Sequence, residues 1–371
     1  MIPFVDLRLQ YQAHQEELEA ALLGVVTDGA FILGSAVGQF EDEFAAYCEA
    51  GHCVGVASGT AALALGFTAL EIGPGDEVIA PANTFFATVV PLLQLGARVV
   101  LVDCDERGLI DVDAVGEAIG ERTKAVVAVH LYGHPADLEP LLHLCDAHNV
   151  ALVEDACQAH GARYRGRRAG SFGAFAAFSF YPSKNLGAYG DGGAVTTNDP
   201  ELARRVRLLR NLGEETKYHH VVVAGNERLD TLHAAVLRVK LRHLDEWNDD
   251  RRRAAAHYAQ ALADTSVELP TTAVDIEHVW HLFPILYPQR DELRGALSER
   301  GIGVGIHYPL PLHLQPSLSH LGYGEGSFPN TERRAREQLS LPMFAEITTE
   351  QVEQVADAVR EYLGARAAST I

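Results

Sequence analysis

The chain has 371 residues, more than a single hydrophobic core usually serves, so we expect more than one domain. Hydrophobic residues make up 47% and charged residues 22%, as in ordinary globular proteins. With 30 Lys and Arg against 50 Asp and Glu, the net charge is −20, which disfavours nucleic acid and anionic lipid as partners.

The first residues, from M-I-P-F-V-D-L-R to about Ala30, have neither signal-peptide nor transit-peptide character. We expect them to pack onto the C-terminal part of the chain or onto a partner subunit. Valine-rich runs predict strands at 77–80, 98–103, 125–130, 151–154, 174–180 and 193–197. Helical patterns lie between them at 60–70, 86–95, 113–119 and 138–148. Because the strands show little polar alternation, we predict an α/β fold whose mostly parallel sheet is buried on both faces.

The alternation of apolar strands and helices ends at about Leu244, and a charged helical pattern covers 245–263. Further helices are predicted at 291–300 and 349–363. The domains are therefore expected to be an N-terminal segment at 1–30, a large domain at 31–244 and a small α+β domain at 245–371. Two arginine clusters, at 204–210 and 251–253, lie in helical patterns and are expected on solvated faces. No apolar run reaches the ~18–20 residues that a membrane-spanning helix needs.

The stretch V-A-S-G-T-A-A-L, from Val56 to Leu63, leads from a strand-like segment into a helix that begins near Thr60. The first amides of a helix have no partners within the helix and, with the helix dipole, attract phosphate. An ordinary N-cap would give the same pattern, so both interpretations stay open here.

The stretch L-V-E-D-A-C-Q-A-H-G places Asp155 at the end of a predicted strand, with Gln158 three residues further on. Ligands of α/β sheets bind at the carboxyl ends of strands, where Asp155 would be well placed. A simple N-cap role is the alternative for this carboxylate.

Lys184 stands alone in F-S-F-Y-P-S-K-N-L-G-A-Y-G-D-G-G, between the strand that ends near Ser179 and a run of glycines. A lysine in apolar surroundings has a lowered pKa, and its neutral amine can form a Schiff base with a carbonyl group. A surface position is the alternative for any single lysine. The three features in this order nevertheless fit one cofactor, since pyridoxal phosphate needs a phosphate cradle, a carboxylate for its ring nitrogen and a lysine for its aldehyde.

Motifs along nearly the whole chain carry a more specific signal. They include I-P-F-V-D-L, A-S-G-T-A-A-L, P-A-N-T-F-F-A-T, V-E-D-A-C-Q-A-H-G-A, F-S-F-Y-P-S-K-N-L-G, N-E-R-L-D-T-L and G-I-H-Y-P-L-P-L-H. In these motifs the chain resembles the DegT/DnrJ/EryC1/StrS sugar aminotransferases. The resemblance implies the aspartate-aminotransferase-like architecture (fold type I of pyridoxal phosphate enzymes), with a large cofactor-binding domain and a small C-terminal domain.

The resemblance also implies a role for each matching position. Lys184 would form the Schiff base, Asp155 would bind the pyridine nitrogen, Gln158 would contact the ring hydroxyl and Phe85 would stack on the ring. Three residues would hold the phosphate: Gly59, Thr60 and Ser179. Asn226 would reach the phosphate from the neighbouring subunit of a homodimer. Tyr181, His307 and Tyr308 would lie near the sugar nucleotide.

The implied reaction is transfer of an amino group from L-glutamate to a nucleotide-linked keto-sugar. Related dehydratases carry histidine at the lysine position, so Lys184 favours transamination. The motifs look most like enzymes that aminate C-3 of dTDP-3-keto-6-deoxyhexoses. The alternatives are a C-4 keto-sugar, a keto-cyclitol, or a non-catalytic regulatory protein on the same fold that uses 231–240 as a DNA-recognition helix. His233 and Ser183 depart from the residues common in the family, which leaves fine specificity open.

The cysteines and histidines show no metal-binding pattern. The five cysteines are scattered and without a C-x-x-C pair, which indicates reduced thiols in a cytoplasmic protein. The 17 histidines include no H-E-x-x-H motif, so we expect no metal site.

Overall fold

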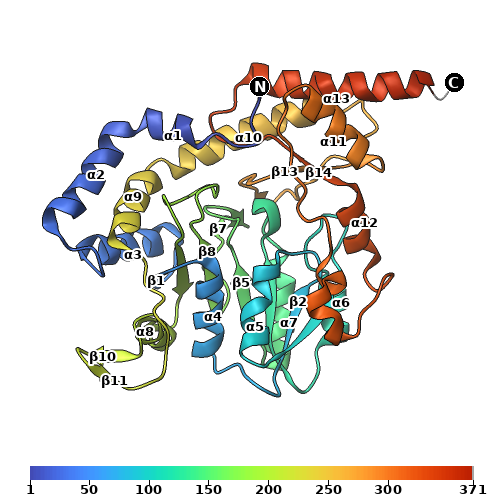
Figure 1. The fold of residues 1–371 in the computed structure, drawn as a ribbon. Coiled ribbons are helices and arrows are strands. Elements are labelled where there is room, and N and C mark those ends of the chain that lie inside the picture. Colours follow the sequence, from blue (N-terminus) through green and yellow to red (C-terminus); the bar gives the residue numbers. More distant parts are fainter. Residues whose placement is uncertain (370–371) are drawn as a thin grey trace.

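The protein is represented by a computed structural model that describes residues 1–369. Its centre is a seven-stranded sheet with the order β1-β9-β8-β5-β4-β2-β3 (Figure 1). The strands are β1 His52–Val56, β2 Glu77–Pro81, β3 Arg98–Val102, β4 Thr123–Val129, β5 Ala151–Asp155, β8 Phe175–Ser179 and β9 Gly193–Thr197. Only β9 runs antiparallel to its neighbours, β8 and β1. The predicted α/β fold with a mostly parallel sheet is confirmed, and β1 is added to the six predicted strands.

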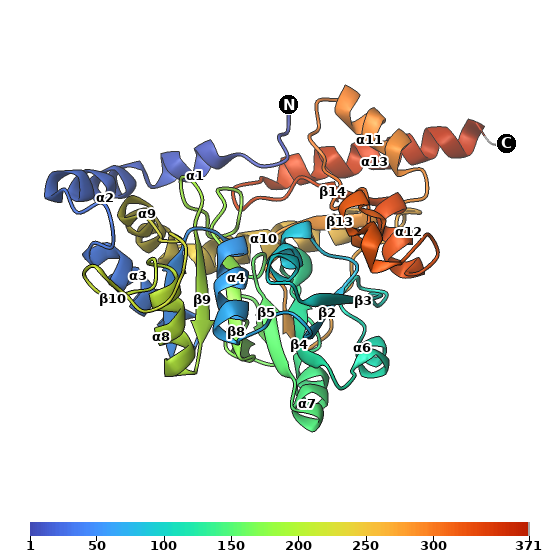
Figure 2. The ribbon, with the colours of Figure 1, turned by 60° about the horizontal axis from the view of Figure 1, so that its bottom comes forward.

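Helices cover both faces of this sheet (Figure 1, Figure 2). Alternate residues of each strand enter different cores: Val78 and Ala80 pack with α4, α5 and α8, whereas Ile79 packs with α6 and α7. The helices are α3 Ser35–Tyr47, α4 Gly59–Ala69, α5 Val90–Gln94, α6 Val112–Ala118, α7 Leu138–His148, α8 Pro200–Leu209 and α9 Thr231–Leu241. Burial of both faces explains why the strands read as continuous apolar runs.

The helix predicted at 86–95 is interrupted. Residues Phe86–Thr88 form a 3-10 turn, and α5 starts at Val90 with Pro91 in its first turn. Proline has no amide hydrogen for the preceding turn and is tolerated only where a helix begins. The chain therefore restarts the helix at this position.

A second hydrophobic core lies in the C-terminal part of the chain, where α10, α11 and α13 pack around β13 and β14. Ile2 contributes to this core and pairs with Ile302, so the N-terminus lies beside C-terminal residues. The elements are α10 Leu244–Ala261, β13 Phe283–Leu286, α11 Arg290–Glu299, α12 Pro329–Glu337, β14 Gln338–Leu341 and α13 Thr349–Ser369. The domain limits given above stay a prediction.

The remaining elements lie around these two cores. They are α1 Leu7–Ala13, α2 Gln15–Asp28, β6 Arg163–Tyr164, β7 Arg167–Arg168, β10 Glu214–Thr216, β11 His219–His220, β12 Ile276–Glu277 and the 3-10 turns Leu131–Gly133, Leu312–Leu314 and Pro316–Leu321. In the described part of the chain, every helix is too short or too polar to cross a membrane.

The structure speaks against the alternative of a DNA-recognition helix and corrects part of the expectation for the arginine clusters. Most of α9 is buried between α2 and α3, so the segment 231–240 cannot enter a DNA groove as a recognition helix. The other arginines of the two clusters are exposed or partly exposed as expected, but Arg210 and Arg251 are buried. Arg210 pairs with Glu41, and Arg251 donates to the carbonyl oxygens of 280, 281 and 343. A helical pattern places an arginine on a helix but does not tell which side of that helix meets solvent.

Candidate active site

A cavity of about 370 Å³ lies where the carboxyl ends of β5 and β8 meet the first turn of α4. It is lined by ten of the eleven predicted site residues: Gly59, Thr60, Phe85, Asp155, Gln158, Ser179, Tyr181, Lys184, His307 and Tyr308. Asn226 is the exception. The cavity is of the size that proteins use for cofactors and small ligands.

The first turn of α4 presents unpartnered amides to the cavity. Ser58 is the N-cap, and its side chain accepts a hydrogen bond of 3.0 Å from the amide of Ala61. Among the described residues the amides of Gly59 and Thr60 have no partner, as expected at the start of a helix. A Cβ atom at Gly59 would lie 2.7 Å from Sγ of Cys157 and from Cβ of Ser179, so only glycine fits there. Ser58 can therefore act as the N-cap while the amides of Gly59 and Thr60 stay available to an anion, so both interpretations of this stretch are compatible.

The adjacent carboxylates Glu154 and Asp155 point to opposite faces of the sheet. Glu154 is fully buried away from the cavity and accepts hydrogen bonds from Nε2 of His130 at 3.0 Å and from the amides of Gly170 and Phe172 at 2.8 Å. Asp155 lies in the cavity wall, where the hydroxyl of Thr88 donates to its Oδ2 at 2.7 Å. Glu154 is therefore structural, and Asp155 is the carboxylate available to a ligand.

Lys184 is half-buried in the cavity wall in the loop that follows β8. Burial lowers the pKa of its amine, and the nearby Cys157 and Asp155 act in the opposite direction. Its neutral form is therefore more populated than that of a solvated lysine, which favours attack on a carbonyl group.

The glycine-rich run after Lys184 is needed for close packing. A Cβ atom at Gly193 would lie 2.3 Å from the carbonyl carbon and oxygen of Ser58, so the start of β9 can approach the N-cap of α4 only as glycine. Nearby, Nζ of Lys240 donates a 2.8 Å hydrogen bond to the carbonyl of Gly187 and lies 4.4 Å from the ring centroid of Tyr189. A buried lysine of α9 thus holds the loop that carries Lys184.

Lys240 gives a prediction about stability and pH. Burial lowers the pKa of Lys240 to about 8, whereas an unfolded chain has its lysines near 10.4. The cost of burying the ammonium is fully present below pH 8 and disappears as the pH rises to about 10.4. We therefore compare the free energies of unfolding of the wild type and of Lys240→Met. Their difference, wild type minus variant, should rise by about 3 kcal/mol between pH 7.5 and 10.5. Urea unfolding of both proteins across this range measures it, and a constant difference would contradict the assigned pKa.

The remaining wall of the cavity is aromatic and polar. Oε1 of Gln158 accepts a 2.6 Å hydrogen bond from the amide of Tyr132, and its Nε2 donates to the Tyr308 hydroxyl at 3.2 Å. Phe85 and Tyr308 have ring centroids 5.2 Å apart. Phe85 and Tyr181 are about half exposed, at 52% and 56%, and so keep free surface for a ligand.

Asn226 lies outside the cavity of its own chain. It is exposed and forms an isolated bridge with Asn211. The segment before it carries several exposed apolar side chains, of which Val223 is fully exposed. Its expected contact with a partner's phosphate site is taken up below.

The structure adds residues that sequence reasoning missed. Thr88 holds Asp155, and His281 lines the cavity close to Lys184. Thr88 lies within the motif P-A-N-T-F-F-A-T, so a signal was available for it. His281 lies far along the chain from Lys184, in a segment without a ligand-binding pattern, and only the fold brings it here.

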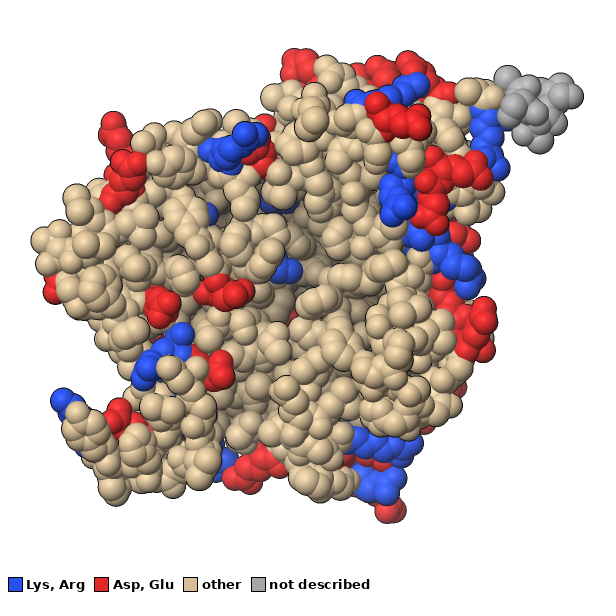
Figure 3. All heavy atoms as spheres, viewed as in Figure 1, with Lys and Arg blue, Asp and Glu red and all other residues tan. Residues whose placement is uncertain are grey.

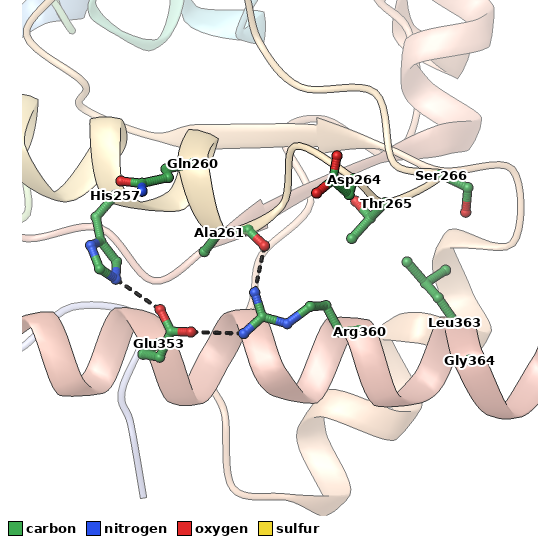
Figure 4. Close-up of a pocket in the computed structure, with 10 residues that line it drawn as sticks. All are labelled: His257, Gln260, Ala261, Asp264, Thr265, Ser266, Glu353, Arg360, Leu363 and Gly364. Atoms are coloured by element: carbon green, nitrogen blue, oxygen red, sulfur yellow. Dashed lines mark hydrogen bonds and ion pairs between the residues drawn. The ribbon is translucent and has the colours of Figure 1, made fainter.

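Two other places have features of a binding site. A larger depression of about 600 Å³ lies between α10 and α13, but His257, Glu353 and Arg360 there bind one another (Figure 4). His14, Glu17 and His243 bring their ligand atoms within 4.8 Å of one another, but Arg242 already binds Glu17 at 2.6 Å. The absence of a metal site stays a prediction.

The groups around the cavity fit pyridoxal phosphate. The unpartnered amides of Gly59 and Thr60 suit a phosphate, Asp155 suits a protonated ring nitrogen and Lys184 suits an aldehyde. The close approach at Gly59 brings Ser179 beside the first turn of α4, where its side chain would also be available to a phosphate.

Comparison with known proteins gives the same result. A sequence model described as the DegT/DnrJ/EryC1/StrS aminotransferase family matches residues 12–360. The dTDP-3-amino-3,4,6-trideoxy-α-D-glucose transaminase of Streptomyces venezuelae is 50% identical over 97% of this chain and 96% of that protein. The erythromycin biosynthesis sensory transduction protein EryC1 of Saccharopolyspora erythraea is 48% identical over 95% of this chain and 97% of that protein. The crystal structure of S. venezuelae DesV in complex with a ketimine intermediate has a TM-score of 0.96 at 50% identity, covering 98% of each chain.

Proposed function

The chain belongs to the DegT/DnrJ/EryC1/StrS aminotransferase family, and from this premise we propose that it transfers an amino group from L-glutamate to C-3 of a dTDP-linked 3-keto-6-deoxyhexose. It is an enzyme of the fold type I architecture with pyridoxal phosphate as its cofactor. One observation carries the reaction type: Lys184, Asp155 and the first turn of α4 line the same cavity.

The side chains divide the chemistry between them. Bound pyridoxal phosphate supplies an electron sink when the amino donor loses its Cα proton. Lys184, with a pKa lowered by burial, holds the cofactor and, once released, accepts that proton as a general base. Asp155 presents its carboxylate to the ring nitrogen, with Thr88 fixing one oxygen. Gly59, Thr60 and Ser179 bind the phosphate, Gln158 the ring hydroxyl and Phe85 the ring face.

The choice of a C-3 keto-sugar rests on the relatives. The S. venezuelae protein at 50% identity is named a dTDP-3-amino-sugar transaminase. Tyr181, His307 and Tyr308 would contact the sugar nucleotide, since they line the same cavity as Lys184 and Tyr181 keeps about half of its surface free. A cytoplasmic location stays a prediction, supported by five free cysteines.

We also propose a homodimer with shared sites. Asn226 is exposed and follows the apolar residues Val221, Val222 and Val223, each exposed by at least 42%. Exposed apolar side chains in a row are typical of a surface that a partner covers. Figure 3 shows one face of the molecule with a central hollow, where Lys or Arg and Asp or Glu groups are scattered over a mostly tan surface and gather at its edges.

Replacing Asn226 tests the shared site. Asn226→Ala should weaken binding of pyridoxal phosphate about 10-fold or more, because a hydrogen bond to an ionised phosphate is lost. Cofactor titration followed by fluorescence measures the dissociation constant. Unchanged affinity would count against the role of Asn226.

A mixture of variants separates contact across the dimer from contact within one chain. In a mixed dimer of Lys184→Ala and Asn226→Ala chains, one site would combine an intact Lys184 with an intact Asn226 from the other chain. One of the two sites in each mixed dimer should then bind the cofactor with wild-type affinity. If both residues act within one chain, no intact site forms.

A regulatory protein is the second candidate, because the relative at 48% identity is named a sensory transduction protein. The burial of α9 and the charge of −20 speak against DNA binding by this chain. DNA binding that weakens with salt, without any amino transfer, would favour this candidate.

The substrate is tested with a panel of ketones. The purified protein receives L-glutamate and either 3-keto or 4-keto dTDP-sugars, or a keto-cyclitol, and mass spectrometry detects the amino product. We expect amination of the 3-keto sugar at a kcat/KM at least about 10-fold above the others, a modest discrimination for a polar site. Amination of the 4-keto sugar or the cyclitol alone would replace the proposed substrate and leave the reaction type intact.

A further inference from the structure

The loop 306–310 carries two of the residues expected to contact the sugar nucleotide, His307 and Tyr308, and it belongs to no helix or strand. Among the described residues, no amide or carbonyl group of this loop forms a hydrogen bond with another backbone group. Contacts made by side chains must therefore determine how the loop lies beside the cavity.

One carbonyl oxygen of this loop, that of His307, is bound by two side chains from distant parts of the chain. The hydroxyl of Tyr132 donates to it at 2.5 Å, and Nε2 of Gln338 donates to it at 2.7 Å. Nε2 of Gln338 also donates to the Tyr132 oxygen at 2.9 Å, whereas Oε1 of Gln338 lies further from that hydroxyl, at 3.1 Å, than the carbonyl does. A carbonyl oxygen has two lone pairs, and both are used here. The peptide that joins His307 to Tyr308 is thereby fixed.

The two donors have little freedom to move. Tyr132 is 4% exposed and Gln338 is 1% exposed. Tyr132 follows β4 in the 3-10 turn Leu131–Gly133 and packs in the core of the seven-stranded sheet. Gln338 is the first residue of β14, and its own carbonyl oxygen accepts from Nη1 of Arg290 at 2.9 Å. The carbonyl of His307 is thus held by buried groups from both cores, in a small network in which each hydrogen bond supports the others.

The backbone of Tyr132 is bound to the opposite side of the cavity wall. Its amide donates to Oε1 of Gln158 at 2.6 Å, so Nε2 of Gln158 is the atom that donates to the Tyr308 hydroxyl at 3.2 Å. Tyr132 has a φ of 61°, in the left-handed region that residues other than glycine rarely adopt, and its contacts must offset this strain. Tyr132 does not line the cavity itself, so it acts on the cavity through Gln158, His307 and Tyr308.

We propose that Tyr132 is a positioning residue for the sugar nucleotide, because its hydroxyl and Gln338 fix the His307–Tyr308 peptide and so place both side chains for the substrate. The inference rests on the proposed function, in which His307 and Tyr308 contact the sugar nucleotide. A loop that is ordered before binding loses less freedom when the substrate arrives, so the hydroxyl acts mainly on affinity. The chemical step depends on Lys184, which has no part in this network.

The test removes single hydroxyl groups. Tyr132→Phe keeps the ring and the amide that binds Gln158, and it deletes one donor to the loop. Tyr258→Phe is the matched control, because the hydroxyl of Tyr258 is also buried and donates to a loop carbonyl, that of Pro342, at 3.0 Å, away from the cavity. Three quantities are compared: KM and kcat for a dTDP-linked 3-keto sugar, the rate of the half-reaction with L-glutamate alone, and the rate at which proteinase K cuts within 306–310.

We expect Tyr132→Phe to raise KM for the keto-sugar about 5-fold, the effect of one lost hydrogen bond. The cutting rate within 306–310 should rise by a similar factor of about 5, because proteolysis follows the population of the open loop. Both kcat and the half-reaction with L-glutamate should stay within about 2-fold of the wild type, and Tyr258→Phe should change none of these quantities by more than about 2-fold. An unchanged KM in Tyr132→Phe, an equal rise in both variants, or an equal slowing of the half-reaction would overturn the proposal.

A second variant covers the case that Tyr132→Phe does not fold. Gln338→Met removes the other donor to the same carbonyl oxygen, and it should raise KM and the cutting rate about 5-fold as well. Unchanged values in Gln338→Met would then overturn the proposal. A wild type that aminates no keto-sugar would instead count against the proposed function, and in that case an unchanged cutting rate in Tyr132→Phe would overturn the role of Tyr132 in holding the loop.

Discussion

Lys184→Ala should lower the rate of amino transfer by at least about 10⁴-fold while the chain still folds. The amine of Lys184 is the one nucleophile in the cavity that can hold an aldehyde as a Schiff base, and it is also the proposed general base. Alanine keeps neither function. Little stability should be lost, because removing this side chain takes away an amine whose charge is costly in the cavity wall. Steady-state production of glutamate-derived 2-oxoglutarate measures the rate.

Lys124→Ala is the matched control for this variant. Lys124 is exposed on β4, away from the cavity, and its loss should leave the rate within about 2-fold of the wild type. Circular dichroism establishes that both variants are folded. Turnover by Lys184→Ala within about 10-fold of the wild type would show that Lys184 is neither the Schiff-base lysine nor the general base.

Asp155→Asn should lower kcat/KM by about 10²–10⁴-fold. The substitution keeps the shape of the side chain but removes the charge that a protonated ring nitrogen requires, and breaking a buried ion pair costs about 3–5 kcal/mol. The remaining oxygen of asparagine can still accept from the amide of Cys157, and the Thr88 hydroxyl can turn to accept from the new NH2 group, so the fold should be kept.

The neighbouring carboxylate gives the contrasting variant. Glu154→Gln should lower the free energy of unfolding by about 1–3 kcal/mol, because Glu154 accepts from His130 and from buried amides on the far side of the sheet. Its kcat/KM should stay within about 3-fold of the wild type once folded. Guanidinium unfolding and steady-state kinetics of the two variants separate the effects. A loss of kcat/KM in Glu154→Gln as large as in Asp155→Asn would contradict the assignment of a structural role to Glu154 and a cofactor-binding role to Asp155.

The sequence was sufficient for the sheet, which depends on local patterns, and for most residues that line the cavity, which the family resemblance implied. Strands buried on both faces read as apolar runs, and Lys184 and Asp155 stand at the ends of such runs. It was not sufficient for side chains whose partners are distant in the chain. Arg251 was expected in solvent, but it binds carbonyl groups of two separate segments. His281 lines the same cavity as Lys184 because α10 binds both the segment before β13 and Asn185.

The visible absorption spectrum of the purified protein, before and after addition of L-glutamate, tests the central claim most directly. A Schiff base between pyridoxal phosphate and Lys184 gives a visible band, and transfer of the amino group to the cofactor removes it. We expect the band in the wild type, its loss with L-glutamate, its return when a dTDP-linked 3-keto sugar is added, and no band from Lys184 in the Lys184→Ala variant. A wild-type protein that shows no band after incubation with pyridoxal phosphate would contradict the account.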